Sequence, residues 1–469
     1  MRTDQPISDT PLDCLVVGAG ISGLASAWFL ARRGARVRVL EAANELGGVM
    51  HSVRDNGFLV ETGPNSTLAR GGAFDEIVHG LGLAPELLVA NPAASRRYVV
   101  QRGAPVALPG NPLAFFTTPI FSLGAKLRLF TEPFHGRARE EESIARFVRR
   151  RLGPEFLDWA IDPFVSGVYA GDPERLSVRA AVPKIYALEA QHGSLIVGAL
   201  SRMLHGRAGG PQPGGRLVSF RGGMQTLPVA IARELGERVV PGAAVTGLSR
   251  AGDGWLVQTA GREHRARQVV LALPAYAAAK LLEPLSADAA RELAAIVYAP
   301  IAAVGLGFRR TQIRHALDGF GMLIPRRENR KTLGVLFSST LFPGRAPDEH
   351  ALLTAFLGGA RHPGIGQADD DAVVGQILAD LRPLLGIEGA PVMTRVTRWA
   401  RAIPQYELGH LERLARLDAA LPALPGLRLR ANYRDGISVA DCVENARRQA
   451  ETFERPAPRL AAVPSAGRH

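Results

Sequence analysis

The N-terminal part of the chain alternates short apolar runs with a helix-forming stretch, a pattern that predicts a βαβ unit. Cys14-Leu15-Val16-Val17 predicts a buried parallel strand. Residues 21–33 are rich in helix formers and end at Gly34, a natural residue for the left-handed position after a helix. Residues 37–40 form a second apolar run, so we expect the chain to return to the same sheet.

The turn between this strand and the helix has the sequence Gly18-Ala19-Gly20-Ile21-Ser22-Gly23. Gly18 permits a tight turn, Gly20 lets the backbone approach a diphosphate, and Gly23 lets the helix pack close to the strand. Glu41 follows the second run, 18 residues after Gly23, where a carboxylate can accept both hydroxyls of an adenosine ribose. The pattern therefore favours a dinucleotide site, and the residues expected in it are Gly18, Gly20, Ile21, Ser22, Gly23, Glu41 and Ala42.

Two later segments are expected to return to this site. Residues 242–246, 255–257 and 269–273 predict short strands separated by turns. Residues 427–430 predict a strand and residues 440–453 a helix, with a glycine-containing turn between them. The amides and dipole at such a helix N-terminus stabilise negative charge on a cofactor. A site built from both ends of the chain implies a discontinuous cofactor domain with the middle of the chain inserted.

The glycine fingerprint alone does not separate NAD from FAD. Leu46-Gly47-Gly48 and Val60-Glu61-Thr62-Gly63-Pro64, however, resemble the flavin oxidases, in which the paired glycines let a loop run past the flavin end of the cofactor. The resemblance implies non-covalent FAD. It also implies a backbone contact to adenine at Val245, a residue that plain sheet core explains equally well. The other contacts implied are Gly47, Gly48, Gly63, Pro64, Asn65, Gly436, Ser438 and Val439.

The chain departs from the flavin oxidases at two positions. Glu45 stands two residues before the paired glycines, where the family usually has arginine, and Ala431 stands where the C-terminal motif usually begins with glycine. A second complete fingerprint is absent from the sequence, because Gly305-Leu306-Gly307 is followed by Arg310 in place of a third glycine. Without a nicotinamide domain, we expect O2 or a quinone to accept the electrons, which indicates an oxidase.

Several ordered motifs across most of the chain resemble the oxygen-dependent protoporphyrinogen oxidase family in particular. They are Gly63-Pro64-Asn65-Ser66, Arg96-Arg97-Tyr98, Gly167-Val168-Tyr169-Ala170-Gly171, Leu176-Ser177-Val178, Gly222-Gly223-Met224-Gln225-Thr226-Leu227-Pro228, Gly319-Phe320-Gly321, Leu357-Gly358-Gly359, Ile403-Pro404-Gln405-Tyr406 and Gly409-His410. The resemblance implies the six-electron oxidation of protoporphyrinogen IX to protoporphyrin IX in haem biosynthesis. Hydride would pass from a meso carbon to flavin N5, and no residue is assigned as a catalytic base or metal ligand.

The resemblance also assigns substrate contacts, motif by motif. Arg97 would bind a propionate, and Gly167 would offer its backbone to the substrate close to the flavin. Leu323, Leu336 and Phe356 would press on the macrocycle. A bulky apolar macrocycle with anionic propionates needs a wide apolar slot and a cation at its rim. The alternatives are a solvated surface charge for Arg97 and ordinary core for the three apolar residues.

Residues 91–210 lack the dinucleotide pattern and predict a helical insertion. Within residues 143–157 one helix face carries Ile144, Phe147, Val148 and Leu152. Residues 112–134 interleave Lys126 and Arg128 with Phe115, Phe116, Phe121, Phe130 and Phe134. Such a segment either inserts shallowly into a bilayer, with its cations facing lipid phosphates, or packs internally. The resemblance favours peripheral attachment to the inner face of the cell membrane.

Composition and charge narrow the class of protein further. The 469 residues, 46% of them hydrophobic, suffice for two or three units with a large core. The net charge of +12 comes almost wholly from arginines scattered along the chain, with no basic run longer than Arg149-Arg150-Arg151, so we expect no nucleic-acid partner. Cys14 and Cys442 give neither a disulfide pattern nor a metal pattern, which fits a cytoplasmic protein, and the start of the chain lacks a secretory layout. A homodimer stays open.

The sequence as a whole predicts an α/β protein. We expect a discontinuous doubly wound, Rossmann-like FAD-binding domain, a mixed-sheet substrate domain and an inserted α-helical lobe. The bounds expected are 1–90, 211–280 and 396–469 for the FAD-binding domain, 91–210 for the lobe and 281–395 for the substrate domain. Three other functions stay open: coproporphyrinogen III oxidation within the same family, flavin amine oxidation, and binding of flavin and porphyrin without turnover.

Overall fold

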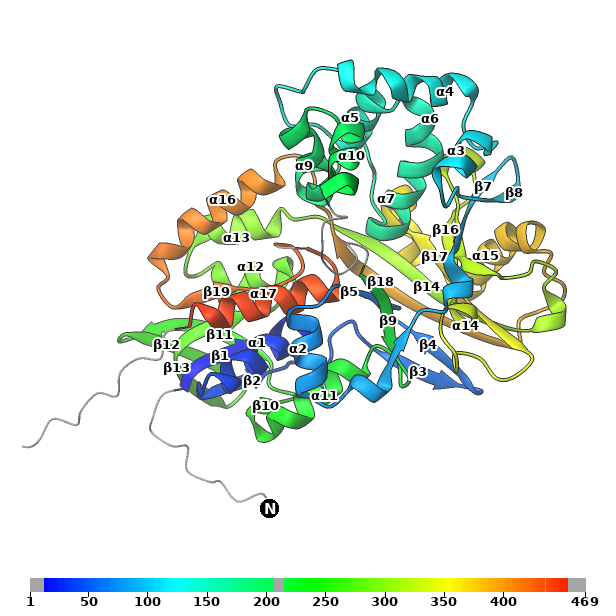
Figure 1. The fold of residues 1–469 in the computed structure, drawn as a ribbon. Coiled ribbons are helices and arrows are strands. Elements are labelled where there is room, and N and C mark those ends of the chain that lie inside the picture. The colour runs from blue at the N-terminus through cyan, green and yellow to red at the C-terminus, as the bar shows by residue number, and fades with distance from the viewer. Residues whose placement is uncertain (1–11, 206–214, 435, 454–469) are drawn as a thin grey trace, which may run out of the picture.

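The computed structural model describes residues 12–205, 215–434 and 436–453. They form two large β-sheets, with helices packed around the first and a helical lobe standing over the second (Figure 1). The sequence predicts a linker at 207–215, which is rich in glycine and proline, and a tail at 456–469; both fall almost wholly outside the described residues.

The first large sheet contains β1 (Leu12–Val17), β2 (Val37–Leu40), β10 (Val239–Val240), β11 (Val245–Ala251), β12 (Gly254–Thr259), β13 (Arg262–Leu271) and β19 (Leu427–Leu429). β1 pairs in parallel with β2 and with β13, while β10 and β19 extend the parallel part on either side. β11 and β12 continue from β13 as an antiparallel meander. The predicted return of the C-terminal segment to the N-terminal sheet is therefore confirmed.

Helices cover both faces of this sheet, because its parallel strands are apolar on both sides. One face carries α1 (Ile21–Arg32), α2 (Ala73–Gly80), α11 (Thr226–Leu235) and α17 (Val439–Glu451). The other face carries α12 (Ala275–Leu282), α13 (Ala287–Ala294) and α16 (His410–Ala420). The doubly wound architecture predicted from the sequence is thus confirmed.

The second large sheet has the order β18 (Met393–Pro404), β14 (Tyr298–Arg309), β17 (His350–Gly358), β16 (Thr332–Phe337), β15 (Gly319–Leu323), β7 (Arg96–Gln101) and β8 (Ala104–Ala107). It is mixed, because β7 runs parallel to β15 while the other pairs are antiparallel. Alternate residues such as Val304, Val335 and Leu353 form one core with α15 (Asp370–Leu385). The side chains between them point to the opposite face of the sheet, away from α15.

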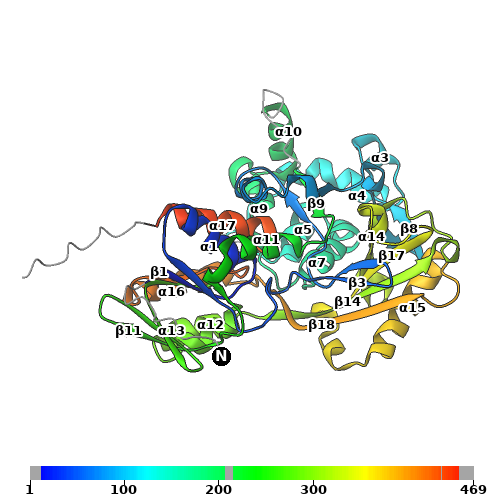
Figure 2. The ribbon, with the colours of Figure 1, turned by 90° about the horizontal axis from the view of Figure 1, so that it is seen from below.

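Two small sheets connect the large ones (Figure 2). They contain the hairpin β3 (Ser52–Asp55) and β4 (Phe58–Glu61), and the strands β5 (Thr67–Ala69), β6 (Leu87–Val89) and β9 (Arg216–Phe220). β4 lies against the second sheet, where Gly305 and Gly307 leave room for Val60 and Phe58. The chain from Glu41 to β5 therefore runs from the first sheet to the face of the second.

The helical lobe contains α3 (Pro112–Thr117), α4 (Leu123–Arg128), α5 (Ile144–Arg151), α6 (Pro154–Phe156), α7 (Asp162–Tyr169), α8 (Val178–Ala181), α9 (Pro183–His192) and α10 (Leu195–His205). The single helix expected at 143–157 is broken, because Gly153 has a φ of 99° and Pro154 follows it. Buried Arg151 pairs with Glu132 and Glu189 in the lobe interior. In the described part of the chain, helices that combine the length and the apolar character of a membrane span do not occur.

The predicted segment of phenylalanines divides between the interior and the surface. Phe115 and Phe121 pack with Phe156 inside the lobe, whereas Phe116, Phe130 and Phe134 are exposed. The expectation that Lys126 faces lipid phosphates is wrong. Its ammonium group is buried and donates hydrogen bonds to the carbonyl oxygens of Phe116 and Thr118, both at 2.8 Å, because those carbonyls lack helical partners.

The domain division predicted from the sequence places strands of one sheet in different domains. β7 and β8 lie within the range 91–210 expected for the lobe, and most of β18 lies within the range 396–469 expected for the FAD-binding domain. All three strands pair into the second sheet. We propose that the lobe begins near α3 and that β7, β8 and β18 belong to the substrate domain.

Candidate functional site

The glycine turn after β1 leaves an open place for a ligand. A Cβ on Gly18 or on Gly23 would collide with backbone, 2.6 Å from the Ala272 carbonyl oxygen and 1.9 Å from that of Gly18 respectively. A Cβ on Gly20 would meet no atom within 4 Å. The φ of Gly20 is −73°, which any residue adopts, so backbone strain does not require glycine there. Gly20 therefore faces free space at the N-terminus of α1, beside the amides of Ile21 and Ser22, where a diphosphate fits.

Glu41 lies beside this turn. Its carboxylate accepts hydrogen bonds from the amides of Ala19 at 2.6 Å and Ala43 at 2.9 Å, with Ala42 exposed between. Backbone bonds also join Glu41 to Val240 and Ala243. They bring half-buried Val245, at the start of β11, to the same end of the sheet. The residues predicted for the adenosine end are therefore together in space.

The paired glycines continue the site away from that end. Gly47 forms a parallel bridge with Gly20, and a Cβ on Gly48 would lie 3.2 Å from the Gly20 Cα. Gly63 packs against Val49, since a Cβ there would lie 1.9 Å from the Val49 carbonyl oxygen. Consecutive contacts thus run from Gly20 to Gly63 and the half-buried Pro64 and Asn65.

The C-terminal motif contacts the same segment just beyond Asn65. Ser438 caps α17 by accepting a hydrogen bond from the Asp441 amide, and Val439 is buried in the core shared with α1. The Ala440 amide donates to Thr67 Oγ1 at 3.2 Å, two residues beyond Asn65. Gly436, at φ 126°, donates its amide to the Tyr406 hydroxyl at 3.1 Å. The N-terminal and C-terminal cofactor motifs therefore form one elongated site.

The two departures from the flavin oxidase pattern are both tolerated locally. Glu45 is 83% exposed, and its carboxylate lies 3.7 Å from His51 Nδ1, so it leaves the glycine turn free. Ala431 is half-buried at the edge of the core around β13. The cradle at Gly20 and the donors at two helix N-termini fit a dinucleotide cofactor.

The predicted substrate residues lie on one face of the second sheet. Cross-strand partners share a face, and two neighbouring rows cross from β7 to β17. One row contains Arg97, Gly321, Leu336 and Thr354, and the next contains Val99, Leu323, Gly334 and Phe356. Leu323, Leu336 and Phe356 are only half-buried, whereas Met322, Val335 and Ala355 on the opposite face are buried against α15. This difference argues against ordinary core for the predicted three.

α7 lies opposite these rows and carries Gly167 (Figure 1). A Cβ on Gly167 would lie 2.5 Å from Leu323 Cδ2, so a larger residue at this position would displace the Leu323 side chain. Phe164, Gly167 and Val168 follow the i, i+3, i+4 pattern of one helix stripe, and Phe164 and Val168 are 41% and 42% exposed. The surface formed by this face of α7 and by the two rows is called the chamber below.

Arg97 stands at the rim of the chamber on β7. Its guanidinium lies 5.5 Å from the ring centroid of Phe320, and the side chain is exposed. Arg96, its neighbour in sequence, pairs with Asp318 instead. An exposed guanidinium stacked on an aromatic ring is oriented yet free to bind a carboxylate.

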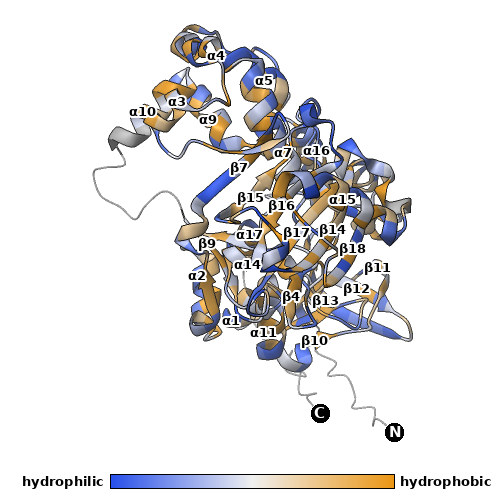
Figure 3. Ribbon diagram, turned by 90° about the vertical axis from the view of Figure 1, so that its right-hand side faces the viewer, coloured by the Kyte–Doolittle hydropathy of each residue, from blue (hydrophilic) through white to orange (hydrophobic). Residues whose placement is uncertain are grey.

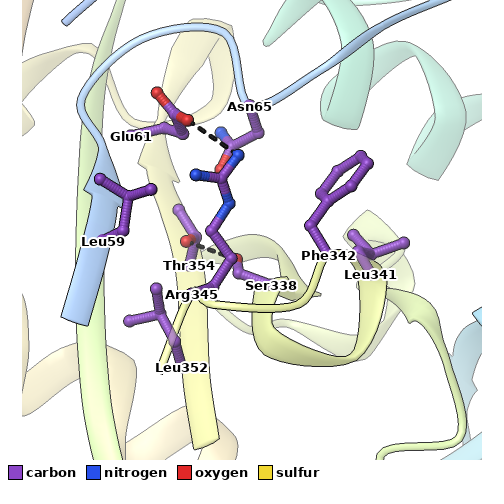
Figure 4. A pocket seen from close by; sticks show the side chains of 9 residues that line it. All are labelled: Leu59, Glu61, Asn65, Ser338, Leu341, Phe342, Arg345, Leu352 and Thr354. Carbon is purple, nitrogen blue, oxygen red and sulfur yellow. Dashed lines mark hydrogen bonds and ion pairs between the residues drawn. The ribbon is translucent and has the colours of Figure 1, made fainter. Parts of the chain in front are cut away.

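A small pocket beside Asn65 is lined by residues of β4, of α14 (Ser338–Leu341) and the loop after it, and of β17 (Figure 4). Arg345, from the loop after α14, reaches across the pocket to Glu61 at the end of β4 and donates to Ser219 Oγ on β9 at 2.6 Å. Glu61 also accepts hydrogen bonds from Ser52 and from the Met224 amide. Burial raises the pKa of Glu61 and lowers the pKa of Arg345, and each is opposed by the charge of the other.

Sequence reasoning missed Phe164, Phe320, Glu61 and Arg345. Phe164 and Val168 stand three before and one after Gly167, a helical spacing that could have placed them on its face. Phe320 lies within the motif Gly319-Phe320-Gly321, which carried part of the family resemblance but assigned Phe320 no role. The pairing of Glu61 with Arg345 left no local signal, because the two residues are far apart in the sequence.

A doubly wound sheet with a glycine cradle, extended by paired glycines and a C-terminal helix, defines a flavin-dependent oxidoreductase. The family model for flavin-containing amine oxidoreductases matches residues 21–452, and the chain belongs to this family. The cofactor is FAD.

Curated relatives narrow the class to porphyrinogen oxidases. The chain is 36% identical to chloroplastic protoporphyrinogen oxidase 1 of Spinacia oleracea, over 93% of this chain and 83% of that one. It is 31% identical to coproporphyrinogen III oxidase of Bacillus subtilis (strain 168), over 93% and 97%. A crystal structure of a candidate protoporphyrinogen oxidase from Exiguobacterium sp. 255-15 superposes with a TM-score of 0.80 at 24% identity, covering 95% of this chain and 99% of that one. The chain is an enzyme of tetrapyrrole synthesis.

Proposed function

We propose that this protein oxidises protoporphyrinogen IX to protoporphyrin IX, with O2 as the final electron acceptor. The observation that carries the proposal is the chamber, in which Leu323, Leu336 and Phe356 share one sheet face with Arg97 at its rim and Gly167 opposite. Six electrons and six protons leave the macrocycle, and three O2 accept them as three H2O2.

The residues of the chain bind, orient and shield the substrate in this proposal. Arg97 holds one propionate at the rim, and this contact orients the macrocycle between α7 and the second sheet. The apolar side chains of the sheet and of α7 exclude water from its faces. The residues of the two glycine motifs hold FAD, which supplies the two-electron acceptor when bound.

Coproporphyrinogen III is the second candidate substrate, because the relatives include coproporphyrinogen III oxidases at 31% and 32% identity. It carries four propionates, whereas protoporphyrinogen IX carries two. The rows across β15, β16 and β17 present leucine, phenylalanine, glycine and one threonine, so additional carboxylates would be desolvated there without cations. The chamber therefore favours the substrate with fewer charges.

Anaerobic mixing of the purified flavoprotein with each porphyrinogen tests the proposal. Protoporphyrinogen IX is expected to bleach the flavin absorbance near ~450 nm, and admission of air is expected to restore it with release of fluorescent porphyrin. Faster bleaching by coproporphyrinogen III would move the assignment to that substrate. Flavin that stays oxidised with both porphyrinogens would overturn the assignment, and amines would then be the next substrates to try.

The lobe supports a peripheral membrane location for the same enzyme. Six large apolar side chains of α3, α4 and the turn Leu129–Phe134 are 54–87% exposed and are called the lobe patch; they are Leu113, Phe116, Leu123, Leu127, Phe130 and Phe134. Figure 3 shows α3 and α4 in the part of the lobe that is remote from the first sheet. An exposed apolar patch on short helices suits shallow insertion into a bilayer, where apolar substrate and product dissolve. On this argument we propose that the enzyme attaches peripherally to a membrane, and the resemblance to the family favours the inner face of the cell membrane.

A further inference from the structure

α7 enters the chamber wall from an irregular turn. A π-helical turn, Leu157–Ile161, leads directly into α7 and breaks the helical register just before Asp162. Isolated π turns are rare and are often found at functional sites. The rotation of α7, which places Gly167 against Leu323, is therefore set by what holds its first residue.

Asp162, that first residue, is tied to the end of β15. The Arg361 guanidinium, 4% exposed, donates one hydrogen bond to Asp162 Oδ2 at 2.7 Å and another to the Ile324 carbonyl oxygen at 2.9 Å. The Arg326 amide donates to the same Asp162 oxygen at 2.9 Å. Ile324 directly follows Leu323, so a single guanidinium bridges the start of α7 and a substrate-facing strand.

The C-terminal end of α7 is held by the same turn of the chain. Ala170, which ends the helix at φ 49°, accepts a hydrogen bond from the Ala360 amide at 2.7 Å. Gly359 packs so closely on Ala170 that a Cβ would lie 2.4 Å from its carbonyl oxygen. Residues 359–361 directly follow β17, which carries Phe356. Through Arg361 they contact the first residue of α7, and through Gly359 and Ala360 they contact Ala170 at its C-terminal end.

We infer that Asp162 and Arg361 are positioning residues that set the gap between α7 and the second sheet, and hence the fit of the porphyrinogen in the chamber. This inference rests on the proposed function. Neither side chain reaches the substrate in it, because both are buried in their own pair behind the helix start. Their effect passes through the distance between Gly167 and Leu323.

The charge and the planar shape of arginine both matter here. One guanidinium serves a carboxylate and a carbonyl at fixed angles, which a lysine ammonium reproduces only in part. Arg327 and Asp158, 3.0 Å apart, join the same turns on the outside, where Arg327 is 58% exposed. That pair supplies a matched control, because exposed pairs hold geometry weakly.

The test compares Arg361→Gln, Arg361→Lys and Arg327→Gln in the FAD-loaded enzyme. For Arg361→Gln we expect KM for protoporphyrinogen to rise about tenfold or more and kcat to fall by less than about threefold, with Arg361→Lys between it and the wild type. Protoporphyrin IX affinity, measured by fluorescence titration, is expected to fall in parallel with flavin absorbance unchanged. Arg327→Gln is expected to match the wild type.

Gly167→Ala in the wild-type and Arg361→Lys backgrounds separates positioning from general loss of stability. The added methyl group is expected to weaken porphyrin binding strongly in the wild type and less in Arg361→Lys, where α7 can shift away from Leu323. Equal losses in both backgrounds, or an unchanged KM with only a lower melting temperature in the Arg361 variants, would overturn the inference. If the wild-type enzyme fails to oxidise any porphyrinogen, the proposed function is wrong, and the inference that rests on it is then wrong as well.

Discussion

The Arg345 guanidinium lies 3.2 Å from the Glu61 carboxylate, and the two side chains are 2% and 4% exposed. The pair joins the loop after α14 to the strand that leads to Asn65. Because both charges are buried, removing one leaves the other without compensation. The pair therefore matters more for the assembly of the chamber than surface ion pairs do.

Arg345→Met is expected to destabilise the protein by about 3–5 kcal/mol, because Glu61 then stays buried without its cation. The double variant with Glu61→Gln should recover part of that loss, and urea unfolding of the four proteins in a double-mutant cycle measures the coupling. Arg314→Met breaks the exposed pair with Glu388 and should change stability by less than about 1 kcal/mol. Additive effects of the Arg345 and Glu61 substitutions would contradict this account.

Gly20→Ala is expected to fold normally and to bind FAD about tenfold or more weakly, because its methyl group enters the open place beside α1. The checks are the ratio of flavin to protein absorbance and the melting temperature of the apoprotein. Gly23→Ala should lower that melting temperature, since its Cβ meets the Gly18 carbonyl oxygen. Wild-type flavin content in Gly20→Ala would argue against a diphosphate at this place.

Arg97→Ala is expected to raise KM for protoporphyrinogen about tenfold to a hundredfold with unchanged flavin content, because one charge-assisted contact to a propionate is lost. Steady-state kinetics with substrate in excess measures it. The neighbouring Arg96→Ala serves as the control, since Arg96 pairs with Asp318 away from the chamber. Equal kinetics in the two variants would show that Arg97 is a solvated surface charge and does not bind a propionate.

His410 should make stability fall in acid. Burial lowers its pKa to about 4, and its Nε2 is hydrogen-bonded to the Tyr433 carbonyl oxygen at 2.9 Å. Since the unfolded chain binds the proton at about 6.5, the contribution of neutral His410 is complete above that pH and is lost as pH falls towards 4, by about 3 kcal/mol at most. His410→Gln should therefore lose less stability between pH 7 and pH 4, as judged from urea midpoints, while exposed His79→Gln should follow the wild type. Identical pH profiles for His410→Gln and the wild type would refute this.

The double variant Phe130→Ser/Phe134→Ser is expected to lower binding to lipid vesicles by at least about tenfold, because each phenylalanine contributes roughly 1.5–3 kcal/mol when buried. Co-sedimentation with vesicles measures the bound fraction. Val229→Ser/Val392→Ser removes apolar side chains of 47% and 45% exposure outside the lobe and should leave binding unchanged. Equal binding by all three proteins would exclude the lobe patch as the contact.

The sequence by itself determined the first sheet and the ends of the cofactor site. Short apolar runs, a glycine turn and an acid at a fixed spacing are local features, and β1, α1 and β2 begin and end within two residues of the places predicted. The return of β19 and α17 was also predictable, because their pattern repeats that of a strand and helix meeting a cofactor.

Only the tertiary structure decided how the second sheet is assembled and what holds the chamber. β7 pairs with β15 across more than two hundred residues, and Glu61 meets Arg345 across a similar separation, so no local periodicity could indicate either contact. Lys126 was misjudged for the same reason, because the carbonyls that bind it are set by the fold of its loop. Local sequence specifies strands, helices and turns, whereas the pairing of distant charges and strands follows from which buried groups need partners once the chain is packed.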